Sequence, residues 1–168
     1  YDYSRSGNPT RDRMEETLAA LENGIGALAF SSGMAATHCV TMLLNSGDHI
    51  VAGADIYGGT YRLLHKICNR SGIEVSLTDA TDPANLSNAI QSNTKLIWIE
   101  SPGNPLMSIT DITASATVAS EAGVLIAVDN TFATPALTRP LDLGVDIVMH
   151  SATKYLGGHS DALGGALV

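Results

Sequence analysis

A lysine preceded by two hydroxyl side chains is the first group in this chain that could do chemistry. Ser151, Thr153 and Lys154 follow an apolar stretch at residues 145–150 that we predict to be a strand. Ligands of open α/β sheets bind beyond the carboxyl ends of the strands. Partly apolar surroundings there would disfavour the charged ammonium of Lys154 and leave a neutral amine able to form a Schiff base. Most lysines are solvated surface residues, so this run alone does not show that Lys154 is reactive.

The same residues allow a second interpretation as a serine hydrolase. Ser151-x-x-Lys154 fits the motif of the penicillin-binding enzymes, in which a serine is acylated and a lysine acts as its base. A four-residue pattern arises often by chance, and no Lys-Thr-Gly follows it in this chain. A hydrolase that uses Ser151 and Lys154 is therefore the remote alternative.

Two further strand ends carry groups that suit a charged ligand. Gly33 and Met34 open a predicted helix directly after an apolar strand candidate at residues 25–30. The free backbone N–H groups of such a helix start favour an anion such as phosphate, although a plain capping turn is an equal alternative. Asp129 closes the apolar run 124–128, where a carboxylate needs a cationic partner or serves as a helix cap.

Loops after two other strands supply an aromatic ring, an amide and an arginine. Tyr57 lies in a glycine-containing segment and Arg62 follows it, with a guanidinium that suits a carboxylate. The stiff loop 100–105 contains two prolines and could orient Asn104 toward a ligand. Ordinary turn chemistry explains each group equally well, so these residues become informative only in combination.

Two other kinds of site are disfavoured. Residues 24–29 fit the dinucleotide fingerprint G-x-G-x-x-A, but a helix precedes them and a strand follows, which reverses the order that binding requires. The five histidines show no pair at the short spacings typical of metal ligands, so we predict no metal site. We interpret His38, His49 and His65 as structural. The roles of His150 and His159 stay open.

The elements that must position these groups fit one compact domain. The 168 residues are 45% hydrophobic and carry a net charge of −8, which favours a small-molecule substrate over nucleic acid or an anionic membrane. The uncharged stretch 23–47 is too polar to cross a membrane. Cys39 and Cys68 match no zinc or redox spacing, so we interpret them as reduced core residues of a cytoplasmic protein.

Short apolar runs alternate with helical patterns along the chain, which is typical of parallel strands joined by crossover helices. We therefore predict an α/β fold with a mostly parallel sheet and helices on both faces. Thr10, Asp82 and Asp111 are predicted helix caps, and Gly24 and Gly72 are predicted helix ends. The predicted strands are residues 25–30, 48–53, 73–77, 96–100, 124–129 and 145–150, with a seventh beginning within 163–168.

A phosphate-binding helix start, a buried acid, an aromatic ring, an amide and a reactive lysine together match the needs of pyridoxal phosphate. Six ordered motifs across the whole chain carry a resemblance to one family. The chain resembles the Cys/Met-metabolism family of pyridoxal-phosphate enzymes, with motifs closest to cystathionine gamma-synthase and gamma-lyase. The motifs are YDYSRSGNPT at 1–10, SSGMAA at 31–36, DIYGGTY at 55–61, ESPGNP at 100–105, DNT at 129–131 and SATKYLGGH at 151–159.

The resemblance implies a role for each matching residue. Lys154 would form the Schiff base with the cofactor and move protons between substrate carbons, while Asp129 would keep the pyridine nitrogen protonated. Tyr57 would stack on the ring and contact substrate, and Asn104 would lie beside the phenolic oxygen. The phosphate would be bound by Gly33, Met34, Ser151 and Thr153.

The resemblance also implies an assembly. Residues 1–10 would be an arm that carries Tyr3 and Arg5 to the phosphate of a neighbouring subunit, giving a homodimer with shared active sites within a homotetramer. Residues 11–168 would be the large cofactor-binding domain of the aspartate-aminotransferase-like fold. We expect the chain to be incomplete at both ends and to lack the small C-terminal domain, because it starts without Met and stops in an apolar run.

Fewer residues bear on the exact reaction. Arg62 resembles the arginine that the cystathionine enzymes place at the far end of a long substrate, and Gly59 stands where methionine gamma-lyases usually have cysteine. We therefore expect gamma-replacement or gamma-elimination on cystathionine or an activated homoserine. The alternatives are cystathionine beta-lyase, an O-acylhomoserine sulfhydrylase, methionine gamma-lyase, or a cofactor-binding module without activity of its own.

Overall fold

The computed structural model describes residues 1–168. It contains one seven-stranded sheet with the strand order β1-β7-β6-β5-β4-β2-β3. The strands β2 to β6 pair in parallel, whereas β7 runs antiparallel to both β1 and β6. The mostly parallel α/β sheet expected from the sequence is thus confirmed. The strands are β1 (Leu28–Phe30), β2 (His49–Gly53), β3 (Glu74–Thr78), β4 (Thr94–Glu100), β5 (Leu125–Asp129), β6 (Ile147–His150) and β7 (Gly165–Leu167).

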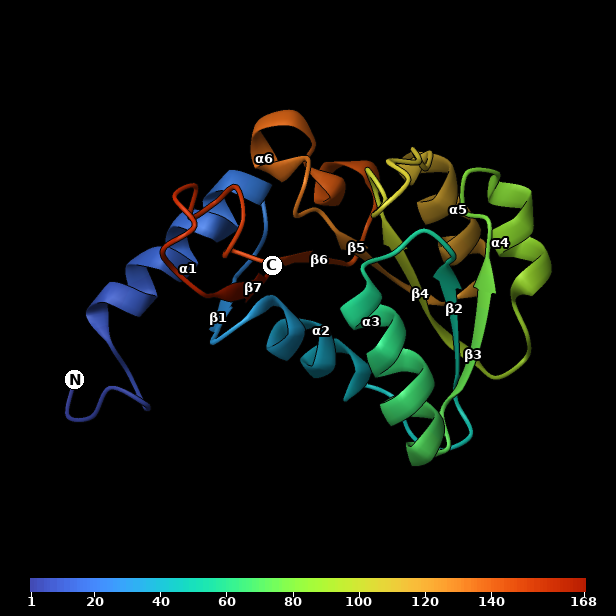
Figure 1. The fold of residues 1–168 in the computed structure, drawn as a ribbon, viewed down its shortest axis with the longest axis horizontal. Coiled ribbons are helices and arrows are strands. Elements are labelled where there is room, and N and C mark those ends of the chain that lie inside the picture. Colours follow the sequence, from blue (N-terminus) through green and yellow to red (C-terminus); the bar gives the residue numbers. More distant parts are fainter.

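Helices cover both faces of the sheet (Figure 1). Side chains of a strand alternate between the two faces. Leu96 and Trp98 of β4 accordingly join the apolar core under α2 and under the π-helix Leu63–Cys68 that continues α3, while Ile97 and Ile99 join the core under α4 and α5. The helices are α1 (Pro9–Glu22), α2 (Gly33–Thr41), α3 (Gly58–Arg62), α4 (Pro83–Ala89), α5 (Ile112–Ala122) and α6 (Thr134–Leu137).

Two predicted boundaries are wrong for local reasons. Helix α1 is capped by Asn8 rather than Thr10, because the Asn8 side chain accepts the N–H of Thr10 at 2.9 Å and Pro9 suits the first helical position. Strand β1 begins at Leu28 rather than residue 25, because its one partner, β7, has three residues to pair with it. The caps Asp82 and Asp111 are confirmed.

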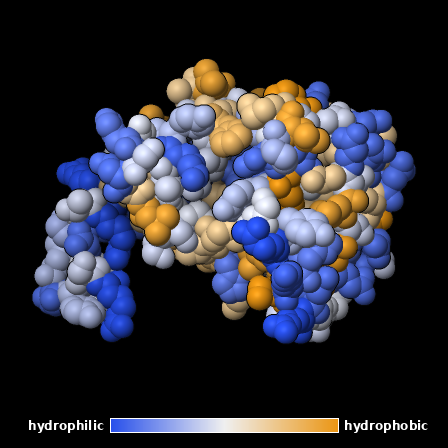
Figure 2. Space-filling model, in the orientation of Figure 1, coloured by the Kyte–Doolittle hydropathy of each residue, from blue (hydrophilic) through white to orange (hydrophobic).

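The visible surface mixes hydrophilic and hydrophobic residues, and the N-terminal segment projects from the body as a largely hydrophilic arm (Figures 1 and 2). Its aromatic residues Tyr1 and Tyr3 are 80% and 60% exposed. No helix has the length and apolar character needed to span a membrane.

Candidate active site

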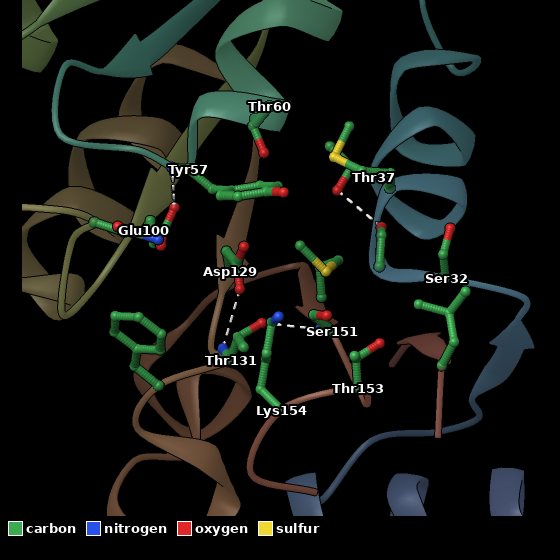
Figure 3. Close-up of a pocket in the computed structure, with 16 residues that line it drawn as sticks. Ser32, Thr37, Tyr57, Thr60, Glu100, Asp129, Thr131, Ser151, Thr153 and Lys154 are labelled. Atoms are coloured by element: carbon green, nitrogen blue, oxygen red, sulfur yellow. Dashed lines mark hydrogen bonds between the residues drawn. The ribbon is translucent and has the colours of Figure 1, made fainter. Parts of the chain in front are cut away.

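A cavity of about 440 Å³ opens beyond the carboxyl ends of the central strands (Figure 3). It brings together residues from loops that are far apart in the sequence. Eight predicted cofactor residues line it: Gly33, Met34, Tyr57, Asn104, Asp129, Ser151, Thr153 and Lys154.

Lys154 lies in a turn that follows β6. Its side chain extends into the cavity toward Asp129 and Thr131 (Figure 3). The turn is tied to the segment before β7, because the Thr153 hydroxyl donates to the Gly164 carbonyl and accepts the Gly164 N–H, both at 3.1 Å. Lys154 is exposed as a residue, and Met34, Phe132 and Met149 line the same cavity.

The start of α2 and the loop after β6 form a tight cup. Ser32 caps α2 by accepting the Ala35 N–H at 3.1 Å, which leaves the first helical N–H groups free of helix partners. A Cβ added at Gly33 would lie 2.7 Å from the Ser151 Cβ and 3.0 Å from its Cα. Glycine is therefore the residue that lets the start of α2 lie directly against Ser151, with both segments lining the cavity.

Asp129 ends β5 and is almost completely buried. Burial raises the pKa of its carboxyl, while hydrogen bonds from Thr131 and the charge of His150 oppose that shift. The Thr131 N–H donates to Oδ1 at 3.0 Å, and Asp129 takes part in none of the ion pairs in the chain. The cationic partner predicted for Asp129 is thus not another side chain, which suits a protonated ring nitrogen of a ligand.

Glu100 is a cavity residue that our reading of the sequence missed. It ends β4 directly beside Asp129, and it is only 6% exposed. Burial and the neighbouring Asp129 charge raise the pKa of Glu100 to about 8. The signal is present in the sequence, because Glu100 closes the predicted strand 96–100 just as Asp129 closes its own apolar run.

Other lining residues were also missed. Thr60 is the most informative, since its hydroxyl is buried in the cavity wall and has no hydrogen-bond partner. Ser32, Thr60 and Thr131 fall within the motifs at 31–36, 55–61 and 129–131 without a role being predicted for them, and the other four lie outside every motif. The missed lining residues besides Glu100 are Ser32, Thr37, Thr60, Thr131, Phe132, Met149 and Leu163.

Three predicted residues lie outside the cavity. Tyr3 and Arg5 are exposed on the projecting arm, where the Arg5 guanidinium lies 5.2 Å from the Tyr3 ring centre. Arg62 is exposed at the end of α3, and its Nη1 would lie 3.5 Å from a Cβ added at Gly58. Its side chain thus folds back toward the loop that carries Tyr57.

His150, left open by the sequence, belongs to a buried network beneath the cavity. Its Nε2 lies 2.6 Å from Oε1 of Glu22, which also accepts the Asn130 amide N–H at 2.9 Å. All three residues are completely buried. The network joins α1 to the residues that directly follow Asp129 and precede Ser151.

Comparison with known proteins assigns this arrangement. The model of one family, described as Cys/Met metabolism PLP-dependent enzyme, matches residues 1–168. The chain belongs to this family. The cofactor of the family is pyridoxal phosphate, as the sequence predicted. Family membership gives no support to the serine hydrolase alternative.

Relatives in the family have more than one named activity. Cystathionine gamma-lyase of Bacillus subtilis (strain 168) is 56% identical over 100% of this chain and 44% of its own length. Cystathionine beta-lyase MetC of the same organism is also 56% identical, over 98% of this chain and 42% of its own length. The cystathionine gamma-synthase of Mycobacterium tuberculosis (strain ATCC 25618 / H37Rv) is 52% identical over 100% of this chain and 44% of its own length. The chain therefore spans less than half the length of these relatives.

Solved structures of the family share the fold. Cystathionine gamma-lyase from Lactobacillus plantarum complexed with L-serine superposes with a TM-score of 0.98 at 50% identity. The metB structure from Corynebacterium glutamicum gives the same values. Each comparison covers 100% of this chain and 44% of the other chain.

The residues of the cavity fit the family's cofactor on three observations. The cup at Gly33 closes only without a Cβ, Asp129 is buried and forms no ion pair, and the Thr60 hydroxyl lacks a partner. These features suit a phosphate, a protonated pyridine nitrogen and a further polar ligand atom, respectively.

Proposed function

We propose that the whole protein is a pyridoxal-phosphate enzyme of transsulfuration that acts on cystathionine or an activated homoserine by gamma-replacement or gamma-elimination. The observation that carries this proposal is the convergence of Lys154, Asp129 and the Gly33 cup on one cavity. When bound, pyridoxal phosphate supplies an electron sink for negative charge that develops on substrate carbons.

The residues of the chain would share the work as follows. Lys154 Nζ would hold the cofactor and, once released by substrate, carry protons between substrate carbons. The Asp129 carboxylate would keep a proton on the ring nitrogen, and its burial would strengthen that interaction. Tyr57 would cover the ring, and Asn104 would lie beside its phenolic oxygen.

Binding of the phosphate would combine backbone and hydroxyl donors. The N–H groups of Gly33 and Met34 lie at the positive end of α2, where an anion is favoured. The hydroxyls of Ser151 and Thr153 come from the opposite side of the same cup. Tyr3 and Arg5 would complete the phosphate site of a neighbouring subunit in a homodimer within a homotetramer.

Arg62 and Gly59 support the choice of a cystathionine-type substrate. A guanidinium binds a distal carboxylate through two parallel hydrogen bonds, and Arg62 leans toward the Tyr57 loop. A Cβ at position 59 would lie 2.3 Å from Cε1 of Tyr57, so the tyrosine ring occupies the space that a cysteine would need. The related beta-lyase, sulfhydrylase and methionine gamma-lyase activities are the alternatives.

A visible absorption spectrum of the purified full-length protein, before and after borohydride reduction, tests the proposal. A yellow protein whose reduced cofactor maps to Lys154 is expected, with turnover of cystathionine or an activated homoserine. Lys154→Ala should abolish turnover, whereas Lys95→Ala, which changes an exposed lysine on β4, should not. A protein that pyridoxal phosphate cannot reconstitute would overturn the proposal.

A further inference from the structure

Tyr57 and Asn104 lie on two loops that leave the sheet side by side. The first loop follows β2 and the second follows β4, and these two strands are paired in parallel. Tyr57 directly precedes α3, where its carbonyl accepts the Tyr61 N–H at 3.0 Å, whereas Asn104 lies in an irregular loop, and no backbone hydrogen bond joins the two loops. Some other contact must set the distance between the tyrosine ring and the amide.

Asp55, on the first loop, binds the backbone of the second. Its Oδ1 accepts the Leu106 N–H at 3.1 Å, and its Oδ2 accepts the Ser108 N–H at 3.2 Å and the Ser108 hydroxyl at 2.6 Å. A Cβ at Gly103 would lie 2.3 Å from Oδ2, so the carboxylate lies directly against bare backbone next to Asn104. Although burial raises the pKa of Asp55, the bonds from Ser108 and Leu106 outweigh it and lower that pKa overall.

Glu100 makes the reverse connection. It stands where β4 gives way to the second loop, and its Oε2 accepts the Tyr57 N–H of the first loop at 2.7 Å. Figure 3 shows this bond and the Tyr57 ring extending from it across the cavity. The segment on each side thus provides a carboxyl group whose oxygens accept backbone N–H groups of the other.

We propose that Asp55 and Glu100 form a reciprocal clasp, defined by these two carboxyl groups, that positions Tyr57 and Asn104 against the cofactor. Both are positioning residues with respect to the reaction, since they act through the two loops. The proposal deepens the function proposed above and rests on it for the identity of the ligand. The clasp itself is a property of the protein without ligand.

The Asp55 half of the clasp is strong because its three donors converge on a carboxylate whose pKa is lowered. Bonds from N–H and O–H groups to a carboxylate are shorter and stronger than neutral ones. Contacts that join the two loops also fix their positions before the ligand arrives, so the ligand need not order them. A displacement of about 1 Å at such a site can lower the rate by about a hundredfold.

The test uses the full-length holoenzyme with Asp55→Asn, whose amide nitrogen cannot accept a hydrogen bond. We expect a bound, Lys154-linked chromophore with a weakened visible circular dichroism signal, and a kcat lower by about 10- to 100-fold with a smaller change in KM. Asp79→Asn is the matched control, because exposed Asp79 bonds only within its own turn, to Thr81 and through its carbonyl to Asn85. The control should match the wild type.

A second readout is independent of the cofactor. Amide hydrogen exchange of the cofactor-free protein should speed up at Leu106 and Ser108 in Asp55→Asn, and also at Tyr57 on the opposite loop. Ser108→Ala, which removes one of the three donors, should give an intermediate effect and serves if Asp55→Asn does not fold. Unchanged exchange at Tyr57 would overturn the clasp.

The two proposals fail in different ways. If the wild type carries no chromophore, the proposed function fails, while the exchange experiment still decides on the clasp. If the chromophore maps to Lys154 but Asp55→Asn retains the wild-type circular dichroism and kcat, the clasp fails and the proposed function stands. In the double variant Asp55→Asn/Glu100→Gln, kcat should be no lower than in the less active of the two single variants. Losses that add up in the double variant would contradict a single coupled unit.

Discussion

Substitution of Gly33 tests the cup most directly, because one methyl group would separate the two segments that form it. In Gly33→Ala the new Cβ would lie 2.7 Å from the Ser151 Cβ and 3.0 Å from both its Cα and its Oγ. Two of these atoms are fixed to the backbone, so a rotamer change cannot relieve the contact. The start of α2 and the loop after β6 must move apart.

The magnitude follows from two opposing effects. Overpacking of this kind costs about 1–3 kcal/mol, whereas alanine at a helical position gains up to about 1 kcal/mol over glycine. The net loss in the free energy of unfolding is therefore about 0–3 kcal/mol. Binding of the phosphate requires the closed cup, so its affinity carries the full overpacking cost, which corresponds to a rise in Kd of about 5- to 150-fold.

The assay titrates cofactor-free full-length protein with pyridoxal phosphate and follows the visible absorbance, with thermal unfolding measured in parallel. Gly26→Ala is the matched control, since Gly26 is exposed and an added Cβ meets no atom within 4 Å. The Kd of the control should equal that of the wild type. A Kd for Gly33→Ala within twofold of the wild type would refute the idea that the close contact with Ser151 shapes the phosphate site.

Four further substitutions follow from the geometry. Asp129→Asn should lower kcat by about 10²- to 10³-fold because the amide cannot hold a proton on the ring nitrogen, and unchanged steady-state turnover would remove Asp129 from the site. Arg62→Ala should raise the KM for cystathionine more than that for methionine, and equal changes would contradict a distal carboxylate contact. Glu22→Ala should lower the free energy of unfolding in urea by about 3–5 kcal/mol, because it leaves buried His150 without its partner; a loss below 1 kcal/mol would contradict that role. Burial raises the pKa of Glu100 to about 8 in the folded protein, so the cofactor-free protein binds more protons folded than unfolded. Its free energy of unfolding should therefore fall as pH rises from about 4.5 to 8. Glu100→Gln should reduce this pH dependence in urea unfolding, and an unchanged dependence would refute the assignment.

The sequence by itself determined the fold class and half of the residues that line the cavity, because these depend on local patterns. Apolar runs that end in Asp129 or precede Lys154 predict strands, and a parallel sheet gathers its strand ends at one edge. Asp82 and Asp111 predict helix starts because a short side-chain acceptor binds the free N–H groups of the first turn. Each of these signals spans a few neighbouring residues.

Only the tertiary structure decided which of these segments meet. The strand order places β4 beside β5, so Glu100 and Asp129 become buried neighbours with raised pKa values. In the folded chain Glu22 contacts His150, which lies 128 positions away in the sequence, and β7 runs antiparallel to its partners. No local periodicity encodes these contacts, because strand pairing and side-chain burial are set by the packing of the whole chain.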